Sequence, residues 1–157
     1  FYNYKLFSEL YENNISSISM SLKTANSLTG DDVKLSERLF VPQSKLRGFV
    51  NGKVGPKDGN DFIGGNYAAT INFTSSIPQI LENSENIDFL VFFDAGNVWG
   101  VDYFDGDDEG SEVRSATGVA VDWLTPVGPL NFTLALPVTK ADNDTTETFR
   151  FNIGTSF

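Results

Sequence analysis

Carboxylates are the most numerous side chains in this sequence that could take part in catalysis. Asp and Glu number 21 against 11 Lys and Arg, which gives a formal net charge of −10, and Cys and His are absent. Without Cys or His, the chain has no thiol nucleophile, no Cys/His metal site and no usual Ser-His-Asp triad. Hydrolysis by two carboxylates would need a pair at a set separation, and the sequence singles out no such pair. We therefore expect no enzyme and no cofactor, and the negative charge argues against a nucleic-acid partner.

Two loop-like segments could in principle bind phosphate or a cation. Gly48 and the pair Gly52-Lys53 are separated by three residues instead of four, and Val54 replaces the Ser or Thr of a phosphate-binding loop. Residues 102–112 hold six carboxylates but lack the glycine and glutamate spacing of a calcium-binding loop. A solvated external loop is the favoured interpretation of 102–112, with weak Ca²⁺ binding or lipopolysaccharide bridging as the alternative. No metal site is predicted.

The hydrophobic pattern repeats every two residues, which is typical of β-strands. Between residues 130 and 138, apolar side chains alternate with polar or small ones, and the segments 87–99 and 149–157 show the same alternation. The pattern predicts an all-β, antiparallel fold of about seven strands. The predicted strands are roughly 1–11, 15–27, 66–77, 86–98, 113–125, 129–139 and 147–157.

The length of these strands indicates a membrane β-barrel. Each has eleven to thirteen residues, whereas strands of soluble sheets average about 5–6 and tilted transmembrane strands need about 9–11. No apolar run is long enough for a transmembrane helix. One face of the strands is apolar and the other polar, as in a barrel with its outer surface in lipid. A soluble β-sandwich, whose apolar face would be its core, is the alternative that alternation alone leaves open.

Four motifs occur in a fixed order between residue 45 and residue 157. They are Lys-Leu-Arg-Gly-Phe at 45–49, Phe-Phe-Asp-Ala-Gly-Asn-Val-Trp at 92–99, Trp-Leu-Thr-Pro-Val-Gly-Pro-Leu at 123–130, and the C-terminal Phe-Arg-Phe-Asn-Ile-Gly-Thr-Ser-Phe at 149–157. Together they resemble the C-terminal barrel region of the family of the outer-membrane protein assembly factor BamA and its relatives. This family includes mitochondrial and chloroplast barrels and two-partner secretion transporters.

The resemblance implies a transmembrane barrel of sixteen strands, of which this chain supplies the C-terminal part, with N-terminal strands and periplasmic domains missing. The long loop 28–65 would fold back into the lumen, with Arg47, Gly48 and Phe49 at its tip. Asp94 matches the acidic wall residue that Arg47 would meet. A guanidinium offers a planar fork to a carboxylate, and Gly48 suits a reversing backbone. Relatives often add a second carboxylate where this chain has Asn72, which puts a two-carboxylate site for Arg47 in doubt.

The final strand resembles the targeting signal of barrel proteins and would form one side of a lateral seam. The residues assigned to this signal are Phe149, Phe151, Ile153, Gly154 and Phe157. Gly154 is where the strand is expected to weaken or kink, because glycine has no side chain to pack. An amphipathic strand of this kind can add to an exposed sheet edge through main-chain hydrogen bonds.

The resemblance implies a bacterial outer-membrane protein that inserts and folds other β-barrel proteins. Its expected partners are outer-membrane lipid, unfolded barrel clients and accessory periplasmic lipoproteins, and the fragment could also self-associate. A two-partner secretion transporter with the same loop motif is the closest alternative. A passive porin would lack the motif pair of Arg47 and Asp94, and a soluble sandwich would purify without detergent.

Overall fold

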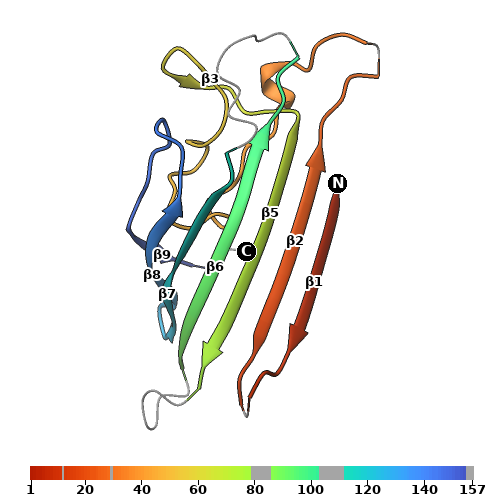
Figure 1. Ribbon diagram of the computed structural model, residues 1–157. Coiled ribbons are helices and arrows are strands. Elements are labelled where there is room, and N and C mark those ends of the chain that lie inside the picture. Colours follow the sequence, from red (N-terminus) through yellow and green to blue (C-terminus); the bar gives the residue numbers. More distant parts are fainter. Residues whose placement is uncertain (12, 29, 79–85, 103–111, 155–157) are drawn as a thin grey trace.

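Seven antiparallel strands form one curved sheet. The computed structural model describes residues 1–11, 13–28, 30–78, 86–102 and 112–154. Neighbouring strands in the sheet order are paired, the first and the last strand lie at the two edges, and the long loop adds a 3₁₀ turn and a small two-stranded hairpin (Figure 1). The sheet order is β1 (Tyr2–Ser8), β2 (Ser16–Thr24), β5 (Tyr67–Ile77), β6 (Ile87–Trp99), β7 (Arg114–Thr125), β8 (Gly128–Thr139) and β9 (Phe149–Ile153); η1 covers Leu35–Glu37, β3 Lys57–Asp58 and β4 Asp61–Phe62.

All seven predicted strands are present, and the four central ones agree to within one residue at each end. The first strand is shorter than predicted, because the Oδ1 of Asn14 accepts a hydrogen bond from the backbone N–H of Leu10 and draws the chain into a turn. The last strand ends at Ile153, and Gly154, which follows it, has a φ of +100°. Residues 155–157, including Phe157, lie outside the described part of the chain.

Connections at the two ends of the sheet differ in length. Residues 9–15, 78–86 and 126–127 join strands at one end, and residues 25–66, 100–113 and 140–148 join them at the other. The two longest connections, 25–66 and 100–113, are both at the second end, whereas 78–86 and 140–148 have nine residues each. Membrane barrels show this asymmetry between periplasmic turns and external loops. Among the described residues, no helix is long and apolar enough to cross a membrane.

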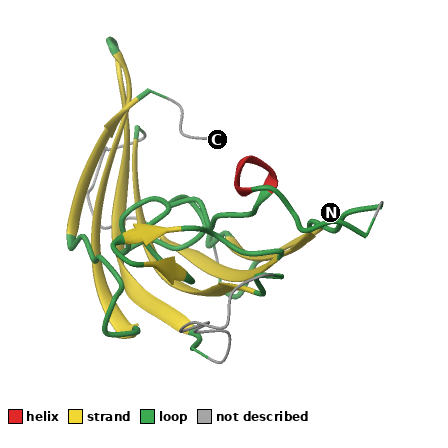
Figure 2. Ribbon diagram, turned by 90° about the horizontal axis from the view of Figure 1, so that it is seen from above, coloured by secondary structure: helices red, strands yellow, loops and turns green. Residues whose placement is uncertain are grey.

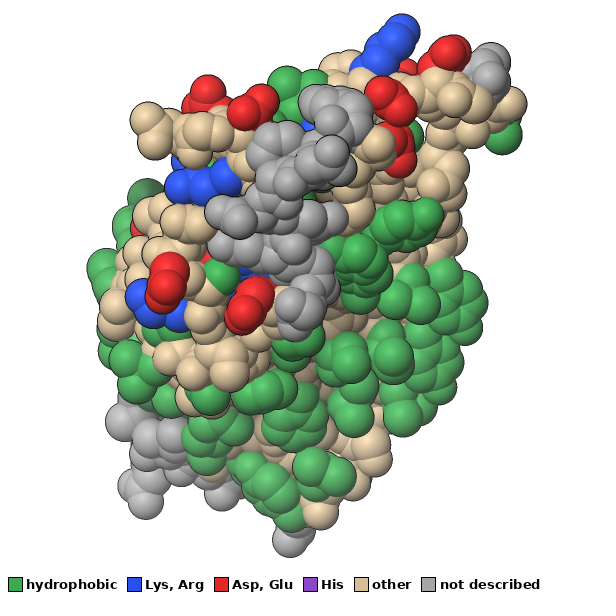
Figure 3. Space-filling model, turned by 45° about the horizontal axis from the view of Figure 1, so that its top comes forward, with side chains coloured by type: hydrophobic (Ala, Val, Ile, Leu, Met, Phe, Trp, Pro, Cys, Tyr) green, Lys and Arg blue, Asp and Glu red, His purple; other side chains and the backbone are tan. Residues whose placement is uncertain are grey.

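The apolar side chains of the strands point away from the covered face of the sheet. In β2, Ile18, Met20 and Leu22 are exposed whereas Ser19 and Ser21 are buried, so the hydrophobicity is inverted relative to a soluble sandwich. Apolar side chains cover the wall of the molecule, and charged ones gather at the end that carries the long connections (Figure 3). An apolar outer surface with polar groups inside is the arrangement expected of a protein surrounded by lipid.

The long connection between β2 and β5 folds back against the concave face of the sheet (Figure 2). It carries its own apolar side chains to that face, where they pack on small or apolar wall residues. The buried cluster consists of Val41, Leu46, Phe49 and Val54 from the connection with Ala68, Val98 and Ala116 from the strands. The loop is therefore held partly by hydrophobic burial, which stabilises at roughly 25 cal/mol per Å² of apolar surface.

Candidate functional site

The tip of the long loop is fixed to β6 by a pairing of Arg47 with Asp94. The guanidinium donates two hydrogen bonds of 2.7 Å, from Nε to Oδ2 and from Nη2 to Oδ1, and the backbone N–H of Arg47 donates a third to Oδ2 at 3.0 Å. The Asp94 side chain is fully buried, and that of Arg47 is 19% exposed. Because both carboxylate oxygens receive charge-assisted bonds, the geometry is the strong, bidentate form of this ion pair.

Asn72 completes the environment of the carboxylate from β5. Its amide nitrogen donates to Oδ1 of Asp94 at 2.9 Å and to the backbone oxygen of Lys45 at 2.8 Å. The side chain therefore holds the loop just before its tip and also supports Asp94, a role that a second carboxylate could not fill because it has no N–H to donate.

Phe92 and a neighbouring glycine form the floor beneath Arg47. The guanidinium carbon lies 3.7 Å from the centroid of the Phe92 ring, which is a close cation–π contact. A Cβ added to Gly118 in β7 would come within 2.7 Å of the tip of that ring and 2.0 Å of the Leu134 carbonyl oxygen. The missing side chain of Gly118 thus allows the ring, and Arg47 above it, to lie close to the strands.

Gly48 brings the loop backbone against the wall. It has a φ of +90°, and a Cβ at this position would lie 3.1 Å from Cβ of Ala116 and 3.2 Å from Cβ of Ala135. Both the left-handed backbone and the short distance to β7 and β8 favour glycine. Phe49, the third residue of the motif, is almost completely buried in the cluster beneath the loop.

Lys45 gives this side of the concave face a positive charge. Burial lowers the pKa of its ammonium group, the charge of Lys5 acts in the same direction, and the Asp94 carboxylate opposes both. Its Nζ donates a hydrogen bond of 3.3 Å to Oγ of Ser19 in β2.

Asp102 secures the start of the loop to the end of β6. Its carboxylate accepts hydrogen bonds from the N–H of Val33 at 3.0 Å and from the amide of Asn66 at 2.7 Å. These bonds, the one from Val33 first, hold the pKa of Asp102 below its ordinary value of 3.8.

The loop start is expected to loosen in acid. A lowered folded-state pKa stabilises the fold above the ordinary value, and this contribution is lost as the pH falls through the lowered pKa. Acidification below about pH 4 should therefore speed hydrogen exchange at the Val33 amide, after correction for the intrinsic rate at each pH. The Asp102→Asn variant should lose this pH dependence, and an unchanged profile in that variant would contradict the assignment.

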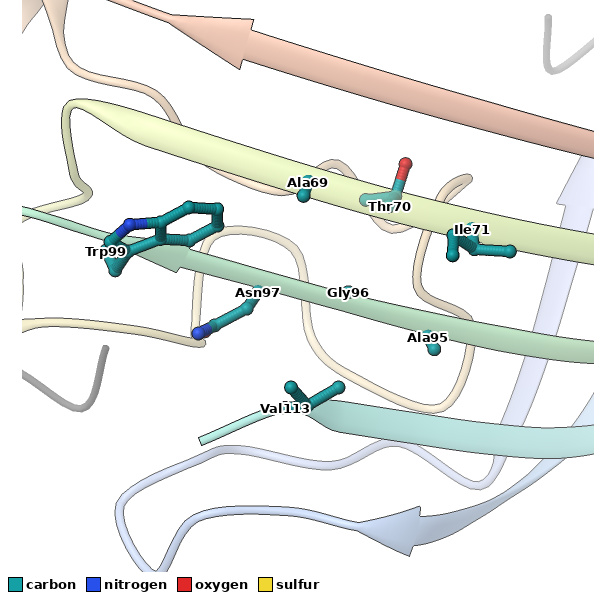
Figure 4. A pocket seen from close by; sticks show the side chains of 8 residues that line it. All are labelled: Ala69, Thr70, Ile71, Ala95, Gly96, Asn97, Trp99 and Val113. Atoms are coloured by element: carbon teal, nitrogen blue, oxygen red, sulfur yellow. The ribbon is translucent and has the colours of Figure 1, made fainter. Parts of the chain in front are cut away.

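The outer face offers no comparable chemistry. A shallow depression of about 260 Å³ lies over β5 and β6, where Ala69, Ala95 and Gly96 leave room beside Trp99 (Figure 4). Its lining contains no titratable side chain. Across the described ranges, no three Asp or Glu residues are grouped so that they could hold a metal ion. Of residues 102–112, only Asp102 and Glu112 fall within the described part of the chain.

One protein-family model matches nearly the whole length of the chain. The model described as the Omp85 superfamily domain matches residues 2–157. The chain belongs to the Omp85 superfamily. The Omp85 chain is thus an outer-membrane protein of a non-enzymatic family, which confirms the expectation that it is no enzyme.

Individual relatives of this Omp85 chain come from bacteria and from yeast. It is 29% identical over 139 residues to the outer membrane protein assembly factor BamA of Neisseria meningitidis, covering 71% of this chain and 17% of that protein. It is 27% identical over 132 residues to BamA of Neorickettsia risticii, with 82% and 18% covered. A SAM50-like protein of Schizosaccharomyces pombe is 29% identical over 135 residues, with 80% and 28% covered. The chain therefore spans less than a third of the length of these relatives.

The fold of the Omp85 chain matches part of a solved barrel. The crystal structure of BamA from Haemophilus ducreyi lacking POTRA domains 1-3 aligns with a TM-score of 0.83 and 29% sequence identity. The alignment covers 95% of this chain and 33% of that one. The prediction of an all-β antiparallel sheet that forms part of a larger barrel is confirmed.

Sequence reasoning named part of this Omp85 site. Arg47, Gly48, Phe49 and Asp94 come together at the loop tip as described above, whereas the residues of the final strand lie elsewhere, at the edge of the sheet. Sequence reasoning did not name Phe92, Gly118, Ala116 or Ala135 as contributors, and it gave Asn72 no role in holding the loop. The small residues at inward positions of β7 and β8 were a usable signal, since they mark where another segment approaches closely.

Proposed function

We propose that this chain is the C-terminal part of a bacterial outer-membrane insertase, which folds other β-barrel proteins into the membrane. The observation that supports this most directly is the docked tip of the long loop, held by Arg47 on the buried carboxylate of Asp94. The relatives named as assembly factors support the same assignment. In this proposal the concave face lines the lumen, the loop 28–65 lies within it, and strands upstream of this chain complete the barrel.

The last strand would provide the seam at which clients enter. β9 pairs with β8 over only five residues, from Phe149 to Ile153, and its other edge has no neighbour among the described strands. An unpaired edge can template an incoming strand through its main-chain N–H and C=O groups. The proposed partners are therefore unfolded barrel proteins and outer-membrane lipid, together with accessory periplasmic lipoproteins expected from the family.

The test is made in the full-length parent protein with single substitutions at the loop tip. Arg47→Ala should impair the folding of client barrels in membranes by about tenfold or more, since a change of about 1.4 kcal/mol in the docking equilibrium already corresponds to tenfold. Arg47→Lys should give an intermediate defect, because a lysine keeps the charge but cannot form the two-pronged bond. The heat-resistant form of the protein's own barrel is followed in parallel, to separate loss of function from loss of folding.

Two further variants sharpen this test. Lys53→Ala removes an exposed cation from the same loop and should leave client folding unchanged. Exchanging the charges, as Arg47→Asp with Asp94→Arg, should restore only part of the activity, since the N–H groups of Arg47 and Asn72 also depend on the carboxylate. Normal client folding in Arg47→Ala would refute the proposed role of the tip. Export of a secreted partner protein, without client assembly, would favour the two-partner secretion transporter.

A further inference from the structure

The connection between β8 and β9 is hydrogen-bonded to the loop tip along several residues. The N–H of Val50 donates to the oxygen of Thr145 at 2.9 Å, and the N–H of Thr145 donates to the oxygen of Lys53 at 3.1 Å. The N–H of Glu147 donates to the oxygen of Gly48 at 3.0 Å. Segment 140–148 therefore adds a short antiparallel pairing to the motif that carries Arg47, and an isolated bridge joins the two residues at its centre, Phe49 and Thr146.

A second buried ion pair holds this connection on the barrel wall. Arg114, the first residue of β7, donates from Nε to Oδ2 of Asp144 at 2.9 Å and from Nη2 to Oδ1 at 3.1 Å. Both side chains are fully buried. The remaining Nη1 of Arg114 donates to Oδ1 of Asn97 in β6 at 2.6 Å and to the backbone oxygen of Glu112 at 2.8 Å.

The same carboxylate also shapes the connection itself. Oδ2 of Asp144 accepts a hydrogen bond of 2.8 Å from the N–H of Ala141. Asp144 thus fixes the turn at 141–144 and attaches that turn to β7. Removing one partner of a buried ion pair leaves the other charge uncompensated, so this attachment is expected to be strong and specific.

The connection leads directly into the last strand. Thr148 accepts a hydrogen bond of 2.8 Å from the N–H of Ala135 in β8, and Phe149, the first residue of β9, pairs with Leu134. The loop tip, the connection and the start of β9 therefore form one continuous hydrogen-bonded unit. A displacement of the tip would break bonds of the segment from which β9 begins.

We propose that Asp144 and Arg114 are positioning residues for the loop tip, and that they couple the docking of Arg47 on Asp94 to the placement of the last strand. Only the purpose of this coupling rests on the proposed function: it would adjust the position of the last strand at the seam to the docked or undocked state of the lumenal loop. The coupling itself is a property of the contacts, and coupling between two sites acts equally in both directions.

Hydrogen exchange of the full-length parent protein tests the coupling without any client. In Asp144→Asn, amides of 140–148 should exchange faster, and so should those of 45–53, including the Arg47 N–H that donates to Asp94. We expect about tenfold acceleration in both segments, whereas a purely local role for Asp144 would affect only 140–148. In the reciprocal arm, Arg47→Ala should accelerate exchange in 140–148.

Asp142→Asn is the matched control, since it removes an exposed carboxylate from the same connection and should leave both segments unchanged. Acceleration limited to the mutated segment in both arms would overturn the proposal. The reciprocal arm decides the question if Asp144→Asn does not fold. Because client folding is not the readout, the coupling could be confirmed even if the test of insertase function failed. Likewise, the insertase function could be confirmed even if the coupling were refuted.

Discussion

Replacing Asp94 with Ala is expected to undock the loop tip at a cost of about 3 kcal/mol. Breaking a buried ion pair by removing one partner typically costs about 3–5 kcal/mol, and the partial exposure of Arg47 places this pair at the lower end. The change also removes the acceptor for the Arg47 backbone N–H and for the amide of Asn72. At this cost, the docked population would fall by roughly two orders of magnitude relative to the undocked one.

Limited proteolysis within residues 28–65, in the full-length protein held in detergent or lipid, measures this effect. Cleavage should be much faster in Asp94→Ala while the heat-resistant barrel persists. Asp58→Ala, which removes an exposed carboxylate from the hairpin in the same loop, should be cleaved at the wild-type rate. Equal protection of all three proteins would show that the apolar cluster alone keeps the loop in place.

The second large effect is expected from Gly48→Ala. An L-residue at a φ of +90° is strained by about 1–2 kcal/mol, and forcing a methyl group into a packed site adds about 1–3 kcal/mol. The added Cβ would meet Ala116 and Ala135, which belong to two neighbouring strands and cannot both move aside easily. The tip should therefore lift from the wall, with faster exchange at the Arg47 amide as the measured result.

Gly59 in the same loop separates the two contributions. It also has a positive φ, of +60°, but an added Cβ would have no atom within 4 Å. Gly59→Ala should therefore show only the backbone penalty and leave the Arg47 amide protected. If Gly48→Ala and Gly59→Ala change hydrogen exchange at the Arg47 amide to the same extent, the close approach of the tip to β7 and β8 does not contribute to the stability of the docked loop.

The strands could be predicted because their signal is local. Alternation places every second side chain on one face, and this period survives in β5, β6, β7 and β8, whose bounds were found to within one residue. The first strand was predicted to run to Tyr11, but the chain turns before that residue, because the side chain of Asn14 accepts a hydrogen bond from the N–H of Leu10. That hydrogen bond depends on the turn conformation, and the two-residue hydrophobic period does not indicate it.

The site could be predicted only where family motifs carried it. Arg47 and Asp94 were expected to meet, whereas Asn72 was regarded only as a departure from the family pattern and proves to donate hydrogen bonds to Asp94 and to the loop backbone. The pairing of the tip with 140–148 had no sequence signal at all. Main-chain hydrogen bonds between two irregular segments depend on where the sheet places them, and any side chain except proline is compatible with them.

The loop's contacts also determine when it can settle during folding. Its tip binds Asp94 and the connection before β9, and the side chains of Gln43 and Glu147, which meet there, are 104 positions apart in the chain. Closing such distant contacts is entropically costly and is rewarded only once the intervening strands are in place. Residues 28–65 are thus synthesised before those strands but dock after them, and a docked loop indicates that the C-terminal strands have already been assembled.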